Sequence, residues 1–241
     1  MASANEPKTL REAILFFADY DNCRKAVEAI RWPDGKVTCP ACGSENVTYL
    51  ETQRRYKCYG KHAKAQFSLK VGTIFEDSAL GFEKWLPALW LLTNCKNGIS
   101  SYELARALGV TQKSAWFMLS RLRLALQDGT GGKLRGDVEV DETFIGGKAR
   151  NMHYARKNRV IGRKGAGMTG KVAVMGLLER HGDSGHSRVR IHLFRSLDEQ
   201  SFRFNTHKMT GASRVALALK GIINRRLTYV ALTGSELPQP C

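Results

Sequence analysis

The chain has 241 residues, 43% of them hydrophobic, and a net charge of +16. This length fits one large domain or two to three small ones, and the hydrophobic content is ordinary for a globular protein. The longest apolar run, Trp85 to Thr93, is far shorter than the roughly 20 residues of a membrane span. The N-terminus carries acids early, unlike a secretory signal. We therefore expect a cytoplasmic protein.

The positive charge is concentrated in the second part of the chain. Residues 1–142 contain 20 Lys or Arg and 17 Asp or Glu, a net charge of +3, whereas residues 143–241 contain 18 and 5, a net charge of +13. Such an imbalance favours a polyanionic partner, most simply nucleic acid. A solvated basic surface without a partner is the alternative.

Residues 8–31 have the spacing of two short amphipathic helices. Asp19 or Asp21 is placed to cap the second helix, and Pro33 follows its end. No chemical motif accompanies these helices. Residues 1–35 are therefore predicted to be a small packing module.

Residues 36–78 contain a metal-ligand pattern with the spacing C-x2-C-x15-C-x3-H. Its members are Cys39, Cys42, Cys58 and His62. The spacing is typical of a tetrahedral zinc ribbon, and in a reducing cytosol closely spaced cysteines favour metal over disulfide. A ribbon with so little core would take part of its folding energy from the metal. The alternative for His62 is a plain surface histidine.

Basic side chains run through the same ribbon with no acid among them, an arrangement that suits phosphate contacts. They are Arg54, Arg55, Lys57, Lys61, Lys64 and Lys70.

Residues 82–128 are predicted to form three helices. The first is apolar at helical spacing and belongs to the core. Ser100 begins the second with a capping box, Gly109 ends it, and Thr111 caps the third, which runs to Leu126. Two helices joined by a tight turn with glycine are typical of a helix-turn-helix, although an ordinary helical hairpin has the same pattern.

The second helix of a helix-turn-helix lies in the major groove and offers its first residues to base edges. Here those residues are Gln112, Lys113 and Ser114, with Phe117 as a further candidate. Arg121 and Arg123, later in the helix, are expected to meet phosphates.

A short alternating strand, Val138 to Ile145, carries Asp141 at its middle and ends at a Gly-Gly pair. Glu142 is adjacent, so the two carboxylates point to opposite faces of the strand. Residues 148–171 follow with eight Lys or Arg and no acid, and two of these, Lys148 and Arg150, are predicted to bind DNA.

Two more strands are predicted at residues 171–179 and 188–194, with a polar turn between them. An amphipathic helix is predicted at residues 213–223, and we expect it to pack on the three strands.

Several of these stretches together resemble a known family. They are the Cys-Pro-x-Cys ribbon, residues 66–78, 94–103, 111–118 and 138–147, and later residues 197–205 and 225–234. They are similar to bacterial insertion-sequence transposases that carry a zinc ribbon ahead of a DDE core and are related to Merlin elements.

The resemblance implies an α+β multi-domain fold. N-terminal helices would occupy residues 1–35, a zinc ribbon 36–78, a helix-turn-helix region 82–128, and a truncated ribonuclease-H-like α/β core 136–241. It also implies binding to the terminal inverted repeats of the element, as a homo-oligomer or beside an intact transposase copy.

In this family two Asp and one Glu hold divalent cations, Mg²⁺ or Mn²⁺, for in-line attack on a DNA phosphate. The resemblance makes Asp141 the first of these carboxylates. The acids that follow Glu142 do not match the positions of the other two: they are Glu179, Asp183, Asp198, Glu199 and Glu236.

We therefore expect an internal deletion near residues 181–197. Two strands and two helices with their connections, on the order of 45 residues, would be missing. The sequence thus predicts a transposase that binds DNA without transposing it. The alternatives are a non-catalytic DNA-binding protein, such as a repressor or a dominant-negative partner, and a regulator unrelated to mobile DNA.

Overall fold

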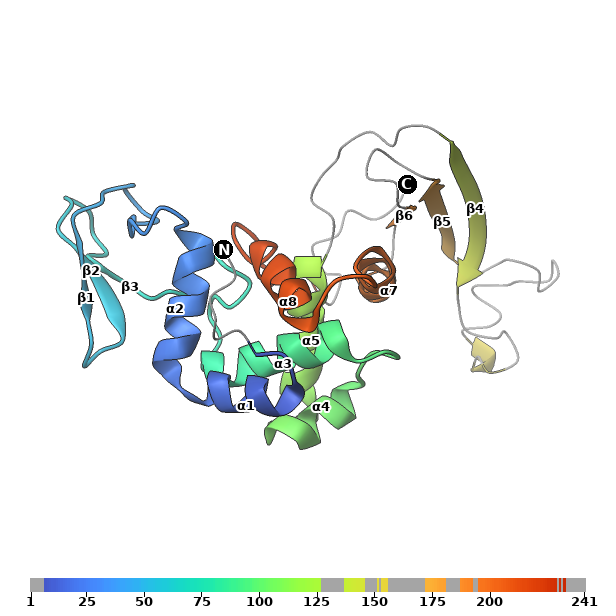
Figure 1. Cartoon of the computed structure of the whole chain (residues 1–241), viewed down its shortest axis with the longest axis horizontal. Helices are drawn as coiled ribbons and strands as arrows, with labels where there is room; N and C mark the ends of the chain where they lie inside the picture. The colour runs from blue at the N-terminus through green and yellow to red at the C-terminus, as the bar shows by residue number, and fades with distance from the viewer. Residues whose placement is uncertain are drawn as a thin grey trace. The chain divides into compact units, whose positions relative to one another are not determined.

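The computed structural model describes residues 7–126, 137–145, 151, 153–155, 172–180, 187–192, 195–228, 230 and 232. The chain divides into two compact units: residues 1–129 with 206–241, and residues 130–205. Both helices and strands are present, as the sequence predicts (Figure 1). In the described ranges no helix has the length and apolarity needed to cross a bilayer.

The first unit contains most of the described elements. They are α1 (Leu10–Ala18), α2 (Tyr20–Arg31), β1 (Val47–Leu50), β2 (Arg55–Cys58), β3 (Gln66–Phe67), α3 (Phe82–Asn94), α4 (Ser101–Leu108), α5 (Gln112–Leu126) and α8 (Gly211–Lys220). The second unit contains β4 (Val138–Ile145), β5 (Val172–Glu179), β6 (Arg188–His192) and α7 (Arg195–Asn205).

Side-chain caps fix the helix ends where the sequence predicts them. The Asp19 carboxylate accepts from the Asp21 N–H at 2.9 Å, and Ser100 Oγ accepts from the Glu103 N–H at 3.1 Å. Gly109 ends α4 with φ 63° and ψ 45°, a left-handed conformation that glycine adopts without a steric penalty. The tight turn between α4 and α5 follows from this residue.

Helix α3 is the centre of the first unit, because α1, α2, α4, α5 and α8 all contact it. Trp85, Leu86, Leu89 and Leu92 are each at most 1% exposed. Burying a side chain of this size stabilises the fold by roughly 1.5–3 kcal/mol relative to leaving it exposed. The predicted core role of this helix is confirmed.

Helix α8 packs on the first unit, whereas the sequence led us to expect it on the three-stranded sheet. It contacts α2, α3 and α5, and Val215 and Leu219 are buried there (Figure 1). An amphipathic pattern shows which face of a helix is apolar but not which element covers it, which is why the expectation was wrong. The domain predicted at 136–241 therefore divides at residue 205.

The ribbon is a three-stranded antiparallel sheet in the order β1-β2-β3. Its core is Tyr56, which is 2% exposed and stacks on Phe67 with ring centroids 5.3 Å apart. The Tyr56 hydroxyl donates to the Glu28 carboxylate, and Trp32 packs edge-on at 5.9 Å. The ribbon is thereby attached to the end of α2.

The second unit is an antiparallel sheet in the order β4-β5-β6 with α7 packed on β6. The sequence analysis did not predict α7, since this segment has few apolar residues. Its contacts are polar as well as apolar: Phe202 is buried, and Glu199 pairs with Arg203 at 2.6 Å. The Asn205 amide bonds both the N–H and the C=O of Val189, at 2.9 and 3.0 Å.

Replacing Leu89 by Ala should lower the free energy of unfolding of the first unit by about 2–5 kcal/mol, because a fully buried side chain leaves a cavity. The matched control is Leu15→Ala, also in a helix but 65% exposed, for which a change below about 0.5 kcal/mol is expected. Urea denaturation followed by tryptophan fluorescence measures both. Equal losses in the two variants would contradict the assigned core.

Candidate metal centre and nucleic-acid interface

The four predicted zinc ligands lie together in the ribbon. The ligand atoms of Cys39, Cys42, Cys58 and His62 are all within 4.8 Å of one another. Cys39 and Cys42 lie in the turn before β1, Cys58 ends β2, and His62 follows it. The β1–β2 pairing places Val47 opposite Cys58 and so carries the second half of the motif back to the first.

The distances fit a tetrahedral zinc ion. Zn–S bonds of about 2.3 Å place two sulfurs about 3.8 Å apart, and a sulfur and a nitrogen about 3.5 Å apart. Cys42 Sγ and Cys58 Sγ are 3.6 Å apart, and Cys39 Sγ lies 3.5 Å from His62 Nε2. Three cysteines and one histidine are a common structural zinc set. The residues present therefore fit the metal, with His62 in the fourth position.

Gly60 lies against the ligands and leaves space for them. A Cβ at this position would meet Cys42 Sγ at 3.0 Å and Cys58 Sγ at 3.3 Å. The Gly60 N–H donates to Cys58 Sγ at 3.2 Å. The sequence analysis did not identify Gly60, although its position between two ligands was a usable signal.

The thiols have opposed pKa shifts. Burial disfavours the Cys39 thiolate, but the backbone N–H groups of Ala41 and Cys42 outweigh it and lower the pKa of Cys39. The Gly60 N–H favours the Cys58 thiolate, yet burial and the neighbouring thiols together raise the pKa of Cys58. Several thiolates this close require a cation, so metal binding and deprotonation are coupled.

Gly60→Ala should weaken zinc binding by about 10- to 100-fold, the range typical of disturbed metal surroundings. The added methyl group must displace two ligand sulfurs by a few tenths of an ångström. Competition with a chromophoric chelator measures the affinity, and the circular dichroism spectrum in excess zinc controls for folding. Wild-type affinity in this variant would show that the sulfurs have room to move.

The α4–α5 pair exposes the first turn of α5. Lys113 is exposed there, whereas Gln112 and Ser114 are half-buried. The Gln112 amide donates to Ser101 Oγ at 2.9 Å, and Ser114 Oγ lies at hydrogen-bond distance, 2.9 Å, from Thr111 Oγ. Of the three residues predicted to read bases, Lys113 has the most open side chain.

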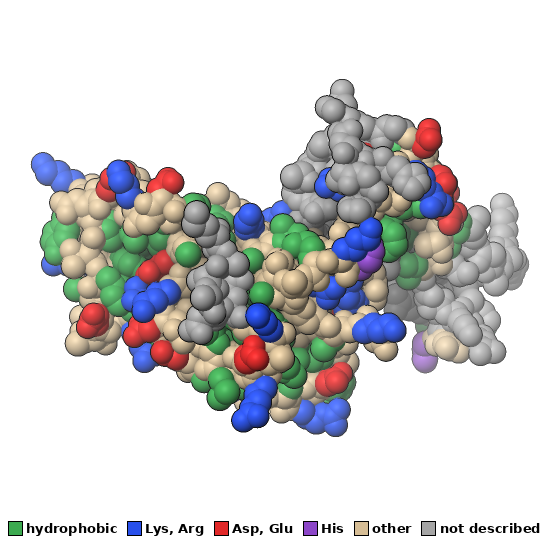
Figure 2. Space-filling view, viewed as in Figure 1, with side chains coloured by type: hydrophobic (Ala, Val, Ile, Leu, Met, Phe, Trp, Pro, Cys, Tyr) green, Lys and Arg blue, Asp and Glu red, His purple; other side chains and the backbone are tan. Residues whose placement is uncertain are grey.

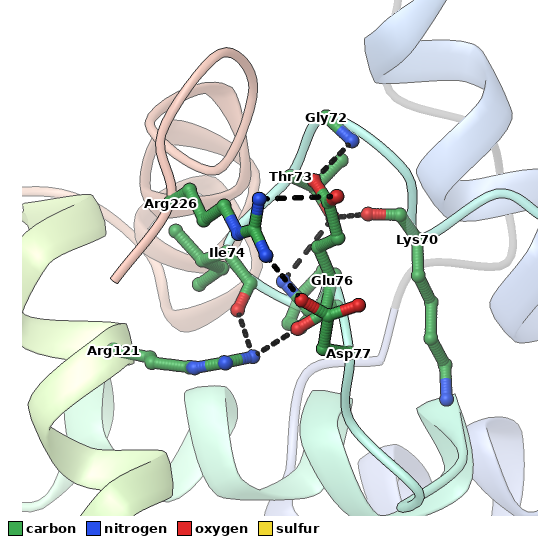
Figure 3. A network of polar contacts seen from close by, with 9 residues as sticks. Lys70, Gly72, Thr73, Ile74, Glu76, Asp77, Arg121 and Arg226 are labelled. Atoms are coloured by element: carbon green, nitrogen blue, oxygen red, sulfur yellow. Dashed lines mark hydrogen bonds and ion pairs between the residues drawn. The ribbon is translucent and has the colours of Figure 1, made fainter. Parts of the chain in front are cut away.

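Arg121 is not placed to meet phosphates, contrary to the expectation. It is 4% exposed, and its guanidinium donates to the carbonyls of Ile74 at 2.9 Å and Glu76 at 2.6 Å (Figure 3). The guanidinium also lies 4.4 Å from the Phe117 ring centroid, so Phe117 serves packing. Burial lowers the pKa of Arg121. Arg123, two residues on, is half-buried.

Trp116 is a candidate that the sequence analysis missed. It is 40% exposed and lies one turn after Lys113 on α5, while Ala115 and Met118 beside it are buried. Helical periodicity places Trp116 away from the buried face, so the signal was available in the spacing. A large exposed aromatic side chain next to a lysine suits a binding surface.

Asp141 is exposed in the middle of β4. Its partner across the sheet is Gly176, which adds no side chain beside it. Glu139, two residues away on the same face, is bound by Arg180 through two contacts of 2.9 Å. Glu142 lies on the other face.

No carboxylate cage surrounds Asp141 in the described ranges. The ribbon cluster is the one group of three or more metal-ligating side chains there. Glu179 pairs with Val138 at the far end of the strand, and the Arg203 guanidinium occupies Glu199. The described residues therefore do not fit a two-cation site. Lys148, Arg150, Asp183 and the side chain of Asp198 lie outside the described residues.

Comparison with known proteins gives two family matches. Residues 19–60 match the transposase zinc-ribbon domain, and residues 133–213 match the ISXO2-like transposase domain. The first match includes α2, to which the ribbon is attached.

A protein described as "Uncharacterized protein in transposable element ISH50", from Halobacterium salinarum (strain ATCC 700922 / JCM 11081 / NRC-1), is 32% identical over 143 residues. That alignment covers 57% of this chain and 47% of the relative, so the chain spans about half the relative's length. No solved structure matches.

Proposed function

This chain belongs to the insertion-sequence transposase family, as both of its domain matches indicate. We therefore propose that it binds the DNA ends of such an element. We further propose that it lacks the metal-dependent strand chemistry of the intact family. The observation that carries this second part is Asp141, a carboxylate that belongs to no group of three or more metal-ligating side chains in the described ranges.

The first unit supplies the surfaces for DNA. Helices α4 and α5 meet at the left-handed Gly109, as in a helix-turn-helix, and α5 exposes Lys113 and Trp116. The ribbon adds exposed basic side chains: Arg54, Arg55, Lys61 and Lys64. On the face seen in Figure 2, basic and acidic side chains are interspersed over this unit.

The second unit supports a ribonuclease-H-like origin. Three antiparallel strands in sequence order, with an acid in the middle of the first, are what the family's core begins with. β4 is an edge strand of the described sheet. A fourth strand would add at that edge, and an edge without a partner is costly or prone to association.

The family's reaction is a phosphoryl transfer in which bound cations activate the attacking oxygen and stabilise the leaving one. The family's two-cation site uses three carboxylates, which hold Mg²⁺ or Mn²⁺ together with the substrate phosphates. A single exposed carboxylate holds a hydrated cation weakly and without fixed geometry. Asp141 alone therefore does not assemble the reaction.

The full chain should bind a terminal-repeat duplex with an affinity that falls steeply as salt rises, since phosphate contacts release counterions. With Mg²⁺ or Mn²⁺ present it should neither nick nor join DNA. Asp141→Ala should bind as the wild type does. Fluorescence anisotropy measures binding, and denaturing gels measure cleavage. Cleavage that disappears in Asp141→Ala would overturn the proposed loss of chemistry.

Chelation of the zinc should abolish specific binding, because the ribbon depends on its metal for folding. Zinc added back should restore it, and Mg²⁺ should not. Binding is followed by gel shift, with metal content verified by elemental analysis. Undiminished affinity in a chain shown to be metal-free would contradict the structural role of the ribbon.

A second candidate function is repression. A chain that occupies the element ends without cleaving them competes with an intact transposase copy. The absence of a carboxylate cluster around Asp141 in the part of the chain that the structure describes favours this role, which predicts that co-expression lowers the transposition frequency of a marked element. Alanine at Lys113 should relieve that inhibition.

A further inference from the structure

The segment after the second unit returns to the first unit and packs on it. We propose that residues 206–228 are a required part of the DNA-binding unit. In this proposal they fix the turn formed by residues 70–78, which connects the ribbon to α3, and so hold the ribbon and the α4–α5 pair in one arrangement. The inference rests on the DNA binding proposed above and adds a dependence on the C-terminal segment.

The backbone of this segment pairs with the turn. The Ile74 N–H donates to the Ile222 carbonyl at 3.1 Å, and the Asn224 N–H donates to the Gly72 carbonyl at 2.9 Å. Between these two bonds, Thr73 and Ile223 form an antiparallel bridge. Segments some 150 residues apart in the chain thus share a short piece of sheet.

Apolar burial accompanies the pairing. Ile222, Leu219 and Leu227 are 0%, 3% and 2% exposed, and Ile74 and Phe75 in the turn are fully buried. Phe75 also packs edge-on against Phe82 and Trp85 of α3, with ring centroids 5.4 and 5.1 Å apart. Removing the segment would expose these buried side chains to water, at a cost proportional to the area uncovered.

The end of α8 also lies very close to the end of α5. A Cβ on Gly221 would be 1.9 Å from the Ala125 carbonyl oxygen. Only glycine permits that approach. The neighbouring Arg225 guanidinium donates to the Leu124 carbonyl. A helix C-terminus leaves its last carbonyls without helical partners, so this cation caps α5.

Two arginines from different segments bind the turn, as Figure 3 shows. From α5, Arg121 binds the carbonyls of Ile74 and Glu76. From the C-terminal segment, Arg226 pairs with the Asp77 carboxylate and lies 3.7 Å from that of Glu76. Asp77 has φ 60°, a left-handed conformation that is uncommon for residues other than glycine, although Asp adopts it more readily than most.

These contacts make Arg121, Leu219 and Arg226 positioning residues. None needs to touch DNA. The turn connects the ribbon to α3, and both α5 and the C-terminal segment bind this turn. Loss of these contacts would therefore let the ribbon move relative to α5 and would weaken the binding of a duplex that contacts both.

The test compares two leucines of one helix in the full chain. Leu219→Ala removes a buried side chain of α8, and Leu217→Ala removes one that is 41% exposed, with the same change in helix propensity. Hydrogen exchange of the Ile74 and Asn224 amides reports the pairing directly. Anisotropy with terminal-repeat DNA reports affinity.

Leu219→Ala should speed exchange at both amides at least about tenfold, because local opening becomes less costly. It should weaken DNA binding by a similar factor, and Leu217→Ala should change neither more than about twofold. Faster exchange with unchanged affinity would overturn the proposed dependence. Wild-type protein that pairs as described but binds no DNA would instead sink the proposed function.

A second pair of variants serves if Leu219→Ala does not fold. Arg226→Glu places a carboxylate beside Asp77 and Glu76, and Lys220→Glu makes the same charge change on an exposed residue of the same segment. The proposal requires faster exchange at Asn224 and weaker binding in Arg226→Glu than in Lys220→Glu. Equal behaviour of the two variants would refute it.

Discussion

Burial of α3 is the interaction on which the rest of the first unit depends. Its aromatic and aliphatic side chains face five other helices, and those helices come from both ends of the chain. No single contact contributes much free energy to such a core. Its stability is the sum of many small dispersion contacts and of the apolar area removed from water. The surfaces proposed to bind DNA are exposed faces of elements whose other faces pack in this core.

Local rules explain what the sequence predicted well. Cys39, Cys42, Cys58 and His62 were identified from spacing alone, because a tetrahedral site tolerates few spacings and the hairpin geometry follows from it. Helix ends were predicted from Asp19, Ser100 and Gly109, since caps act within one turn. Strands β4 to β6 followed from alternation and from the turns between them.

Non-local rules explain the failures. Arg121 was expected on the DNA-facing side of α5, but its partners are carbonyls in a turn about 45 residues earlier, which no local pattern encodes. Helix α8 had the right amphipathicity and was given the wrong neighbour. Helix α7 was missed because Asn205 and an internal ion pair hold it as much as its few apolar side chains do.

The chain leaves the first unit after α5 and comes back to it before α8. The second unit is thus an insertion between the two segments that form the first unit. If the insertion behaves as a flexible loop, shortening it from roughly 120 to roughly 76 residues would change the free energy of bringing its two ends together by less than about 1 kcal/mol. Removing residues from the middle of the second unit would therefore leave the core of the first unit intact, because both segments that build that core lie outside residues 130–205.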